Sequence, residues 1–229
     1  TYLISLVILL AMAATGLFLL ATERSGSNLV RSIIEAHSDI SAPHPYGTGF
    51  FYTGNVAAPS ELSAGKAYTL VRDILISKRH SRTANSVTLD QDAVYSRLDR
   101  RADSPLAYEK ALYDEYSFTE NTSYWCNKNP ALLKNIDNIL SFYSNPTFIY
   151  LVRDPRDVVL SFKNSTVGDY HPVLTARRWR DEQQHALDML ETHQDRFHLL
   201  RYEELLQNPE RTVRKLCRDI GIDFETQML

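Results

Sequence analysis

The amino-acid sequence predicts an α/β fold of three layers, with a central parallel sheet and helices on both faces. Two apolar runs, "FLLAT" and "TFIYLV" (residues 147–152), are typical of strands that are covered on both sides. A third strand, "FHLLRY", precedes a final helical segment. Because helical patterns follow these runs, strands alternate with helices, and this alternation indicates a parallel sheet.

Two of the helices are predicted from apolar stripes and end signals. "NLVRSIIEAH" should bury Leu29, Ile33 and Ala36 along one face. "NPALLKNIDNIL" should form a single helix with Asn129 as its cap and Pro130 in its first turn.

The other helices are expected on either side of the predicted strands. One begins at "DPRDVVLSF", one covers residues 174–193, and a last one covers "NPERTVRKLCRDIGI", with Gly221 just past its end. Residues 55–122 should hold helical segments joined by loops, and the acidic start of "DQDAVYSRLDRR" suits a helix N-terminus.

Composition is that of an ordinary globular chain. Its 229 residues suffice for one domain, and 23% of them are charged. The net charge of −3 predicts no nucleic-acid partner, so any anion site must be local. Cys126 and Cys217 form neither a disulfide framework nor a metal cluster. Buried free thiols are favoured for both, and one bridge between them is the alternative.

The N-terminal segment is uncharged up to Thr22, which is long enough for a membrane span. If residues 17–21 form a strand, however, about fifteen residues remain, roughly 22 Å of helix against a hydrocarbon core of ~30 Å. We therefore separate residues 1–15 from a domain of residues 16–229. Two alternatives stay open: a membrane anchor, with a Golgi-type lumenal domain in a eukaryote, or a helix packed on a cytoplasmic domain.

The segment "TERSGSNL" has the features of an anion-binding loop. Arg24 adds a fixed cation, and Gly26 permits a backbone conformation that other residues resist. The free N–H groups from Ser25 to Asn28 and the positive end of the helix should face one point, where Ser25 and Ser27 add hydroxyls. Phosphate or sulfate would fit there. The alternative is a polar turn before a helix.

A second motif, "IYLVRDPRDVVLSF", places Arg153 at the carboxyl end of a buried strand, where open α/β sheets bind ligands. Ser161 follows on the next helix. Alone, Arg153 could pair with Asp154 or Asp157, and Ser161 could be a small packing residue. Two such motifs at strand ends favour a shared ligand.

Together, "ATERSGSNLVRSIIEAH" and "FIYLVRDPRDVVLSF" resemble the two nucleotide-binding signatures of the sulfotransferase family, which uses 3′-phosphoadenosine 5′-phosphosulfate (PAPS). The resemblance covers roughly residues 17–224 and implies a P-loop-like sheet. The nucleoside-triphosphatase pattern Gly-x-x-x-x-Gly-Lys-Ser/Thr is absent. The usual signature is Lys or Arg, then Ser-Gly-Thr, then Thr or Ser. Asn28 stands at the last of these positions and departs from the pattern.

The resemblance also assigns roles to residues. Arg24 and the loop of Ser25, Gly26, Ser27 and Asn28 would hold the 5′-phosphosulfate, and Arg153 and Ser161 would hold the 3′-phosphate. "RYEELLQNPE" is similar to the family segment whose tyrosine lies near the adenine, which nominates Tyr202.

"WCNKNPALL" is similar to a Lys-x-Pro element found in several branches of this family, the protein-tyrosine sulfotransferases among them. The resemblance implies that its lysine, Lys128, approaches the sulfuryl group. A cation at a helix N-terminus is electrostatically misplaced unless an anion is shared with it. The alternative is a solvated surface lysine.

A general base must accept the proton of the acceptor hydroxyl. Related enzymes place a Glu or His in the loop after the first helix, which here reads "SAPHPYGTG" and nominates His44. His37 competes, but it should pack against or cap the helix, and Glu35 should be solvated. The loop has no pair of glutamates, which separates the chain from the tyrosine-sulfating branch.

The resemblance implies in-line transfer of the sulfuryl group, with adenosine 3′,5′-bisphosphate (PAP) as the product. Arg24, Lys128 and the loop N–H groups would stabilise the charge that develops on the bridging oxygen. No metal is expected, because side chains supply the cations and the histidines show no metal-ligand spacing.

Two other functions stay open: a non-catalytic relative that binds PAP or a partner, and a nucleotide kinase with an atypical phosphate loop. The acceptor is open among carbohydrates, peptides and small hydroxyl compounds. Residues 45–122 and 165–175 should shape its site. Related enzymes usually continue beyond the final helix, so part of the cofactor site could be supplied otherwise.

Overall fold

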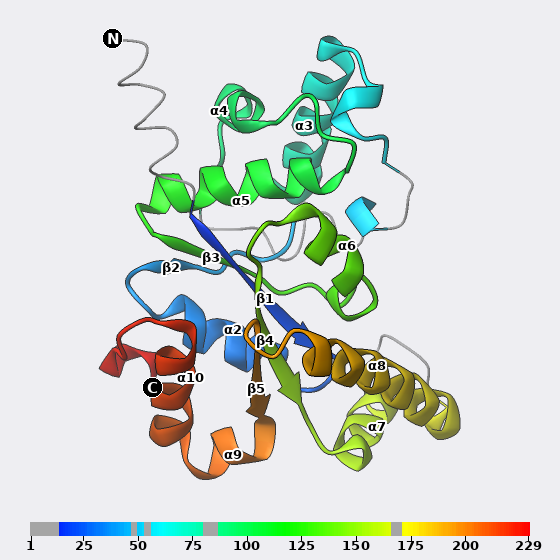
Figure 1. The fold of residues 1–229 in the computed structure, drawn as a ribbon, viewed down its shortest axis with the longest axis vertical. Helices are drawn as coiled ribbons and strands as arrows, with labels where there is room; N and C mark the ends of the chain where they lie inside the picture. Colours follow the sequence, from blue (N-terminus) through cyan, green and yellow to red (C-terminus); the bar gives the residue numbers. More distant parts are fainter. Residues whose placement is uncertain (1–13, 47–49, 53–55, 80–86, 166–170) are drawn as a thin grey trace. The chain divides into compact units, whose positions relative to one another are not determined.

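The computed structural model has the predicted α/β architecture, a parallel sheet with helices around it (Figure 1). It describes residues 14–46, 50–52, 56–79, 87–165 and 171–229. The predicted N-terminal segment lies almost wholly outside these ranges, so the division at residue 15 and the choice between anchor and packed helix stay predictions. Within the described ranges, no helix combines the length and the apolar character needed to cross a membrane.

One sheet contains five strands in the order β2-β3-β1-β4-β5. Their bounds are β1 Thr15–Ala21, β2 Ile40–Ser41, β3 Tyr124–Asn127, β4 Thr147–Val152 and β5 Phe197–Arg201. β1, β4 and β5 confirm the three predicted strands. β2 and β3 were not predicted, because two and four residues are too few to show a strand pattern.

The described chain divides into two compact units. The first contains the residues up to Gly16 together with Ser38–Asn127. Its helices are α3 (Ala64–Arg79), α4 (Gln91–Arg97) and α5 (Leu106–Glu120), with short 3₁₀ turns at Phe50–Tyr52 and Pro59–Glu61. These confirm the helical segments expected between residues 55 and 122. Asp90 caps α4 by accepting from the N–H of Ala93 at 2.9 Å.

The second unit contains Leu17–His37 and Lys128–Leu229. Its helices are α2 (Ser27–Glu35), α6 (Ile136–Phe142), α7 (Pro155–Lys163), α8 (Pro172–Thr192), α9 (Tyr202–Gln207) and α10 (Pro209–Ile220). α7, α8 and α10 match the prediction closely, and Gly221 ends α10 with a φ of 81°. The short helix α9 was not predicted.

β1 and β4 form the buried centre of the second unit, and Figure 1 shows β4 between β1 and β5. The side chains of Phe148–Leu151 are at most 2% exposed. Because successive side chains of a strand point to opposite faces, this burial shows that both faces are covered, as predicted. Parallel pairing sets Ala21 opposite Leu151 and Val152 opposite Arg201, so the carboxyl ends of three strands lie at one edge.

The predicted buried face of α2 is wrong. Val30 and Ile34 are each 1% exposed, whereas Leu29 is 42% exposed. The buried residues are offset from the predicted stripe by one residue, about 100° around the helix, and are also apolar. Packing against the rest of the unit therefore selects the face.

The helix predicted from Asn129 onward is also wrong in its start. A 3₁₀ turn at Leu132–Lys134 precedes α6, which begins only at Ile136. The side-chain amide of Asn135 donates to the carbonyl of Ala131 at 2.8 Å. That carbonyl is the acceptor a continuous helix would use, so the local side-chain bond competes with helix formation.

The two cysteines confirm the favoured alternative. Cys126 in β3 and Cys217 in α10 are both buried thiols that are not joined in a disulfide. Burial raises the pKa of the Cys217 thiol, which keeps it protonated and unreactive at neutral pH.

Candidate active site

The loop between β1 and α2 has an unusual backbone. Thr22 follows the strand and is 1% exposed. Arg24 has a φ of 71° and Gly26 a φ of 92°, both in the left-handed region. That region is costly for arginine, so the surrounding structure must hold it there. The predicted tight loop between strand and helix is present.

The N-terminus of α2 lacks a side-chain cap in the described part of the chain. Gly26 occupies the cap position, and the first turn contains no acidic residue. By contrast, Asp154 caps α7 by accepting from the N–H of Arg156 at 2.8 Å. An uncapped N-terminus presents backbone donors and the positive end of the helix dipole, which together suit an anion.

One of the predicted backbone donors is already used. The N–H of Ser25 donates to the carbonyl of Thr22 at 3.2 Å, so it is not free as predicted. The side chain of Ser25 is 1% exposed, whereas Ser27 and Asn28 line a cavity beside the loop. Because this turn uses the N–H of Ser25, the backbone N–H groups that remain for an anion are those of the first turn of α2.

The second motif lies directly against this loop. Nε of Arg24 donates to Oγ of Ser161 on α7 at 3.1 Å. Arg153, just after β4, donates through Nη1 to the carbonyl of Arg24 at 3.2 Å. The two motifs come together as predicted, and the groups assigned to opposite ends of the nucleotide also contact each other.

Tyr202, the first residue after β5, completes the cluster. The Arg153 guanidinium lies 4.5 Å from the centre of the Tyr202 ring, a cation–π contact. A Cβ built on Gly26 would lie 2.2 Å from the ring carbon Cε2 of Tyr202. Glycine is therefore required at position 26 for two reasons: the positive φ of the backbone and the close approach of the Tyr202 ring.

Arg153 has at least one N–H donor in this cluster that no described residue accepts. Asp154, a predicted partner, pairs instead with Arg156 at 2.5 Å, and this bonding lowers the pKa of Asp154 to about 2. Nη2 of Arg153 lies 3.8 Å from the exposed carboxylate of Asp157. Its Nε is buried and has no hydrogen-bond partner among the described residues. Buried donors without partners are rare, which favours a ligand here.

Lys128 lines a cavity of about 150 Å³ together with the loop. The lining residues are Leu19, Ala21, Glu23, Arg24, Ser27, Asn28, Lys128, Asn129 and Pro130. Arg24 and Lys128 thus line the same cavity as Ser27 and Asn28 of the first turn of α2. Oδ1 of Asn129 accepts from the N–H of Ala131 at 3.0 Å, so Asn129 caps a turn rather than the predicted helix.

The candidate general bases fall in different units. His44 lies in the first unit after β2 and is half-buried, and its role stays a prediction. His37 belongs to the second unit, where its buried Nε2 lies 2.8 Å from the carbonyl of Asp223. This contact confirms that His37 packs at the helix end. Glu35 is half-exposed and pairs with Arg31 at 2.6 Å.

The sequence did not reveal Glu109, which is 1% exposed on α5 of the first unit. The hydroxyl of Tyr52 donates to its Oε1 at 2.7 Å. Burial raises the pKa of Glu109 to about 7, although bonds from Tyr52 and Asn127 oppose the rise. The available signal was its apolar setting in "LAYEKALYDEY", which buries most of α5 around it.

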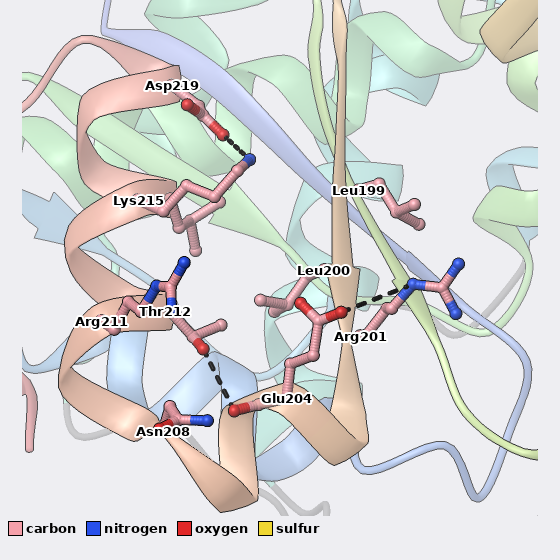
Figure 2. A pocket seen from close by; sticks show the side chains of 10 residues that line it. Leu199, Leu200, Arg201, Glu204, Asn208, Arg211, Thr212, Lys215 and Asp219 are labelled. Atoms are coloured by element: carbon pink, nitrogen blue, oxygen red, sulfur yellow. Dashed lines mark hydrogen bonds and ion pairs between the residues drawn. The ribbon is translucent and has the colours of Figure 1, made fainter.

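A further cavity of about 390 Å³ lies beside β5, α9 and α10 (Figure 2). It contains none of the predicted site residues. Figure 2 shows Lys215 paired with Asp219 and Arg201 paired with Glu204, the latter at 3.7 Å. These four charges pair with each other, which leaves Arg211 as the remaining charged residue of the lining. In the described ranges, no three His, Cys, Asp or Glu residues are grouped so that they could hold a metal ion.

The profile of the "Sulfotransferase family" matches residues 16–226. Two curated relatives are a protein-tyrosine sulfotransferase of Drosophila melanogaster, 21% identical, and protein-tyrosine sulfotransferase 1 of Danio rerio, 25% identical. Each match covers 93% of this chain but only 39% and 55% of the relatives, so the chain spans about half their length or less.

Solved structures share the fold. The sulfotransferase domain of the Synechococcus PCC 7002 olefin synthase has a TM-score of 0.64 at 20% identity, over 94% of this chain and 76% of that one. A mouse sulfotransferase complexed with PAP has a TM-score of 0.50 at 12% identity, over 92% of this chain and 60% of that one.

Proposed function

Because the chain belongs to the sulfotransferase family, we propose that it transfers the sulfuryl group of PAPS to an acceptor hydroxyl. One observation carries the proposal: the segments after β1, β4 and β5 meet beside an uncapped helix N-terminus. A nucleotide with anionic groups at both its 5′ and 3′ positions needs donors at two places, and in open α/β sheets the carboxyl ends of the strands supply such a site. The arrangement supplies them within one unit.

The residues present fit PAPS. The first turn of α2, Arg24 and Lys128 would hold the 5′-phosphosulfate, and Arg153 with Ser161 would hold the 3′-phosphate. The buried Nε of Arg153, without a partner in the described ranges, supports this assignment. Tyr202 offers a ring for the adenine, and the PAP complex of the mouse relative is consistent with the choice of nucleotide. When bound, PAPS supplies the activated sulfuryl group.

The protein's own groups then have separate tasks. Arg24, Lys128 and the N–H groups of α2 stabilise the negative charge that grows on the bridging oxygen. They are held by the fold before reaction, so little reorganisation is needed. His44 is the residue proposed to accept the proton of the acceptor hydroxyl.

The acceptor class is best approached through the curated relatives, both named protein-tyrosine sulfotransferases. A peptide tyrosine is therefore the first acceptor to test, although the loop after α2 lacks the glutamate pair expected of that branch. Carbohydrates and small hydroxyl compounds form the comparison set.

Two measurements test the proposal. Calorimetric titration with PAP should show one site, and radiolabelled PAPS should transfer sulfate to at least one member of an acceptor panel. Binding of PAP without transfer to any acceptor would favour a non-catalytic relative. Magnesium-dependent turnover of ATP would instead support a kinase.

A further inference from the structure

Glu23 is an acidic residue in the lining of the proposed donor site. It lies on the loop between Thr22 and Arg24 and lines the same cavity as Lys128. A carboxylate at this position opposes the binding of an anion, because like charges repel across a short distance. The structure must therefore offset the charge of Glu23 if the cavity is to accept a phosphosulfate.

Arg178 on α8 provides the offset. Its Nη1 lies 2.9 Å from Oε2 of Glu23, and its Nε donates to Oε1 of Glu182 at 2.8 Å. Lys134 lies 3.6 Å from the same Glu182 carboxylate. Two carboxylates are thus matched by two cations, and the fork of Arg178 joins the loop to α8.

A second bond from α8 reaches the adjoining residue of the loop. Nε2 of Gln183 donates to Oγ1 of Thr22 at 2.9 Å, and both residues are at most 5% exposed. The hydroxyl of Tyr150 in β4 donates to Oε1 of Gln183, and this bond orients the amide. Burial raises the pKa of Tyr150 to about 12, so this hydroxyl stays protonated and keeps donating.

Consecutive loop residues are therefore held from α8, immediately before the arginine with the left-handed backbone. On its other side, Arg24 is held by Arg153 and Ser161. A non-glycine residue in this conformation persists only where its surroundings determine it.

We propose that Arg178 is a positioning residue for the donor site: it neutralises Glu23 and, with Gln183, holds the loop ready for the anion. The inference rests on the proposed function and deepens it. If Arg178 only held the fold together, its loss would weaken PAP binding whether or not residue 23 carried a charge. That difference makes the two roles separable.

A double-mutant cycle on PAP affinity, measured by calorimetry, tests the proposal. Arg178→Gln should weaken PAP binding by about tenfold or more, because it leaves Glu23 as an uncompensated charge. Glu23→Gln should bind PAP at least as tightly as the wild type. The variant with both changes should recover to within about threefold of the wild type.

Matched variants exclude a purely structural effect. Glu182→Gln keeps the pair between Arg178 and Glu23 and should leave PAP affinity within about threefold. Arg178→Lys keeps the positive charge and should lose less affinity than Arg178→Gln, which also covers the case in which the glutamine variant does not fold.

The outcomes separate this inference from the proposed function. If the wild type binds PAP but Arg178→Gln binds equally well, or if the added Glu23→Gln restores nothing, the inference is overturned. If the wild type binds no PAP, both the proposed function and the inference fail.

Discussion

Replacing Glu109 by glutamine should remove a pH-dependent loss of stability from the first unit. Glu109 is almost fully buried, and burial raises its pKa from 4.5 to about 7. The folded state therefore binds the proton more tightly than the unfolded state does. Its contribution to stability is complete below pH 4.5 and is lost as the pH rises to about 7.

The size of the loss follows from the two pKa values. At about 1.4 kcal/mol per pH unit, the interval from 4.5 to about 7 corresponds to about 3 kcal/mol. Glutamine keeps an oxygen that can accept from the hydroxyl of Tyr52, but it does not ionise. Relative to the wild type, Glu109→Gln should therefore become more stable by up to about 3 kcal/mol between about pH 4.5 and about pH 8.

Urea denaturation followed by tryptophan fluorescence measures this difference, since Trp125 is buried in the same unit. The gap between the two urea midpoints should widen by about 1 M or more between the low and high pH. Tyr52→Phe removes a hydrogen bond that lowers the Glu109 pKa, so it should extend the loss to higher pH. Glu120→Gln, an exposed change on the same helix, controls for net charge.

A gap that stays constant with pH would refute this reasoning, because it would show that Glu109 titrates alike in the folded and unfolded states. A gap that widens toward low pH would contradict it as well, since the sign would then be that of a depressed carboxyl pKa.

Substitutions in the candidate site test its assigned roles. Gly26→Ala should abolish PAP binding in calorimetry, because the new Cβ would lie 2.2 Å from the Tyr202 ring at a φ of 92°, and unchanged binding would show that the loop adapts. Arg153→Ala should raise the Kd for PAP by about tenfold or more. His44→Ala should lower kcat by about a hundredfold in a PAPS transfer assay without changing PAP affinity; an equal loss of affinity would mean that His44 is misassigned. Lys128→Ala should lower kcat by about a hundredfold at saturating PAPS, and an unaltered kcat would remove it from the mechanism.

The parts of the fold that were predicted correctly depend on local features. The bounds of β4 followed from one continuous apolar run, and α10 from a proline near its start and Gly221 after its end. These signals act within a few residues, so a single sequence contains them. The convergence of Arg24 and Arg153 was also anticipated, because parallel strands end at the same edge of a sheet.

The features that were predicted wrongly or missed depend on side-chain packing and on hydrogen bonds that a sequence pattern does not show. The predicted stripe of α2 is apolar, but so are Val30 and Ile34 one residue further along, and only packing selects them over Leu29. The start of α6 was misplaced because a side-chain bond from Asn135 outcompeted the helix. The hydrogen bonds to the buried Glu109 come from Tyr52 and Asn127, which lie outside its helix, so the sequence around Glu109 could not show them.

By itself, the sequence determined the alternation of strands and helices, the glycine of the loop and the two cationic motifs, because each is written in contiguous residues. Only the tertiary structure decided that Glu23 is matched by Arg178 and that Thr22 is held by Gln183, 161 positions away. The physical reason is that a charge or a buried hydroxyl acquires its partner through packing. No local pattern specifies which distant residue will lie beside it.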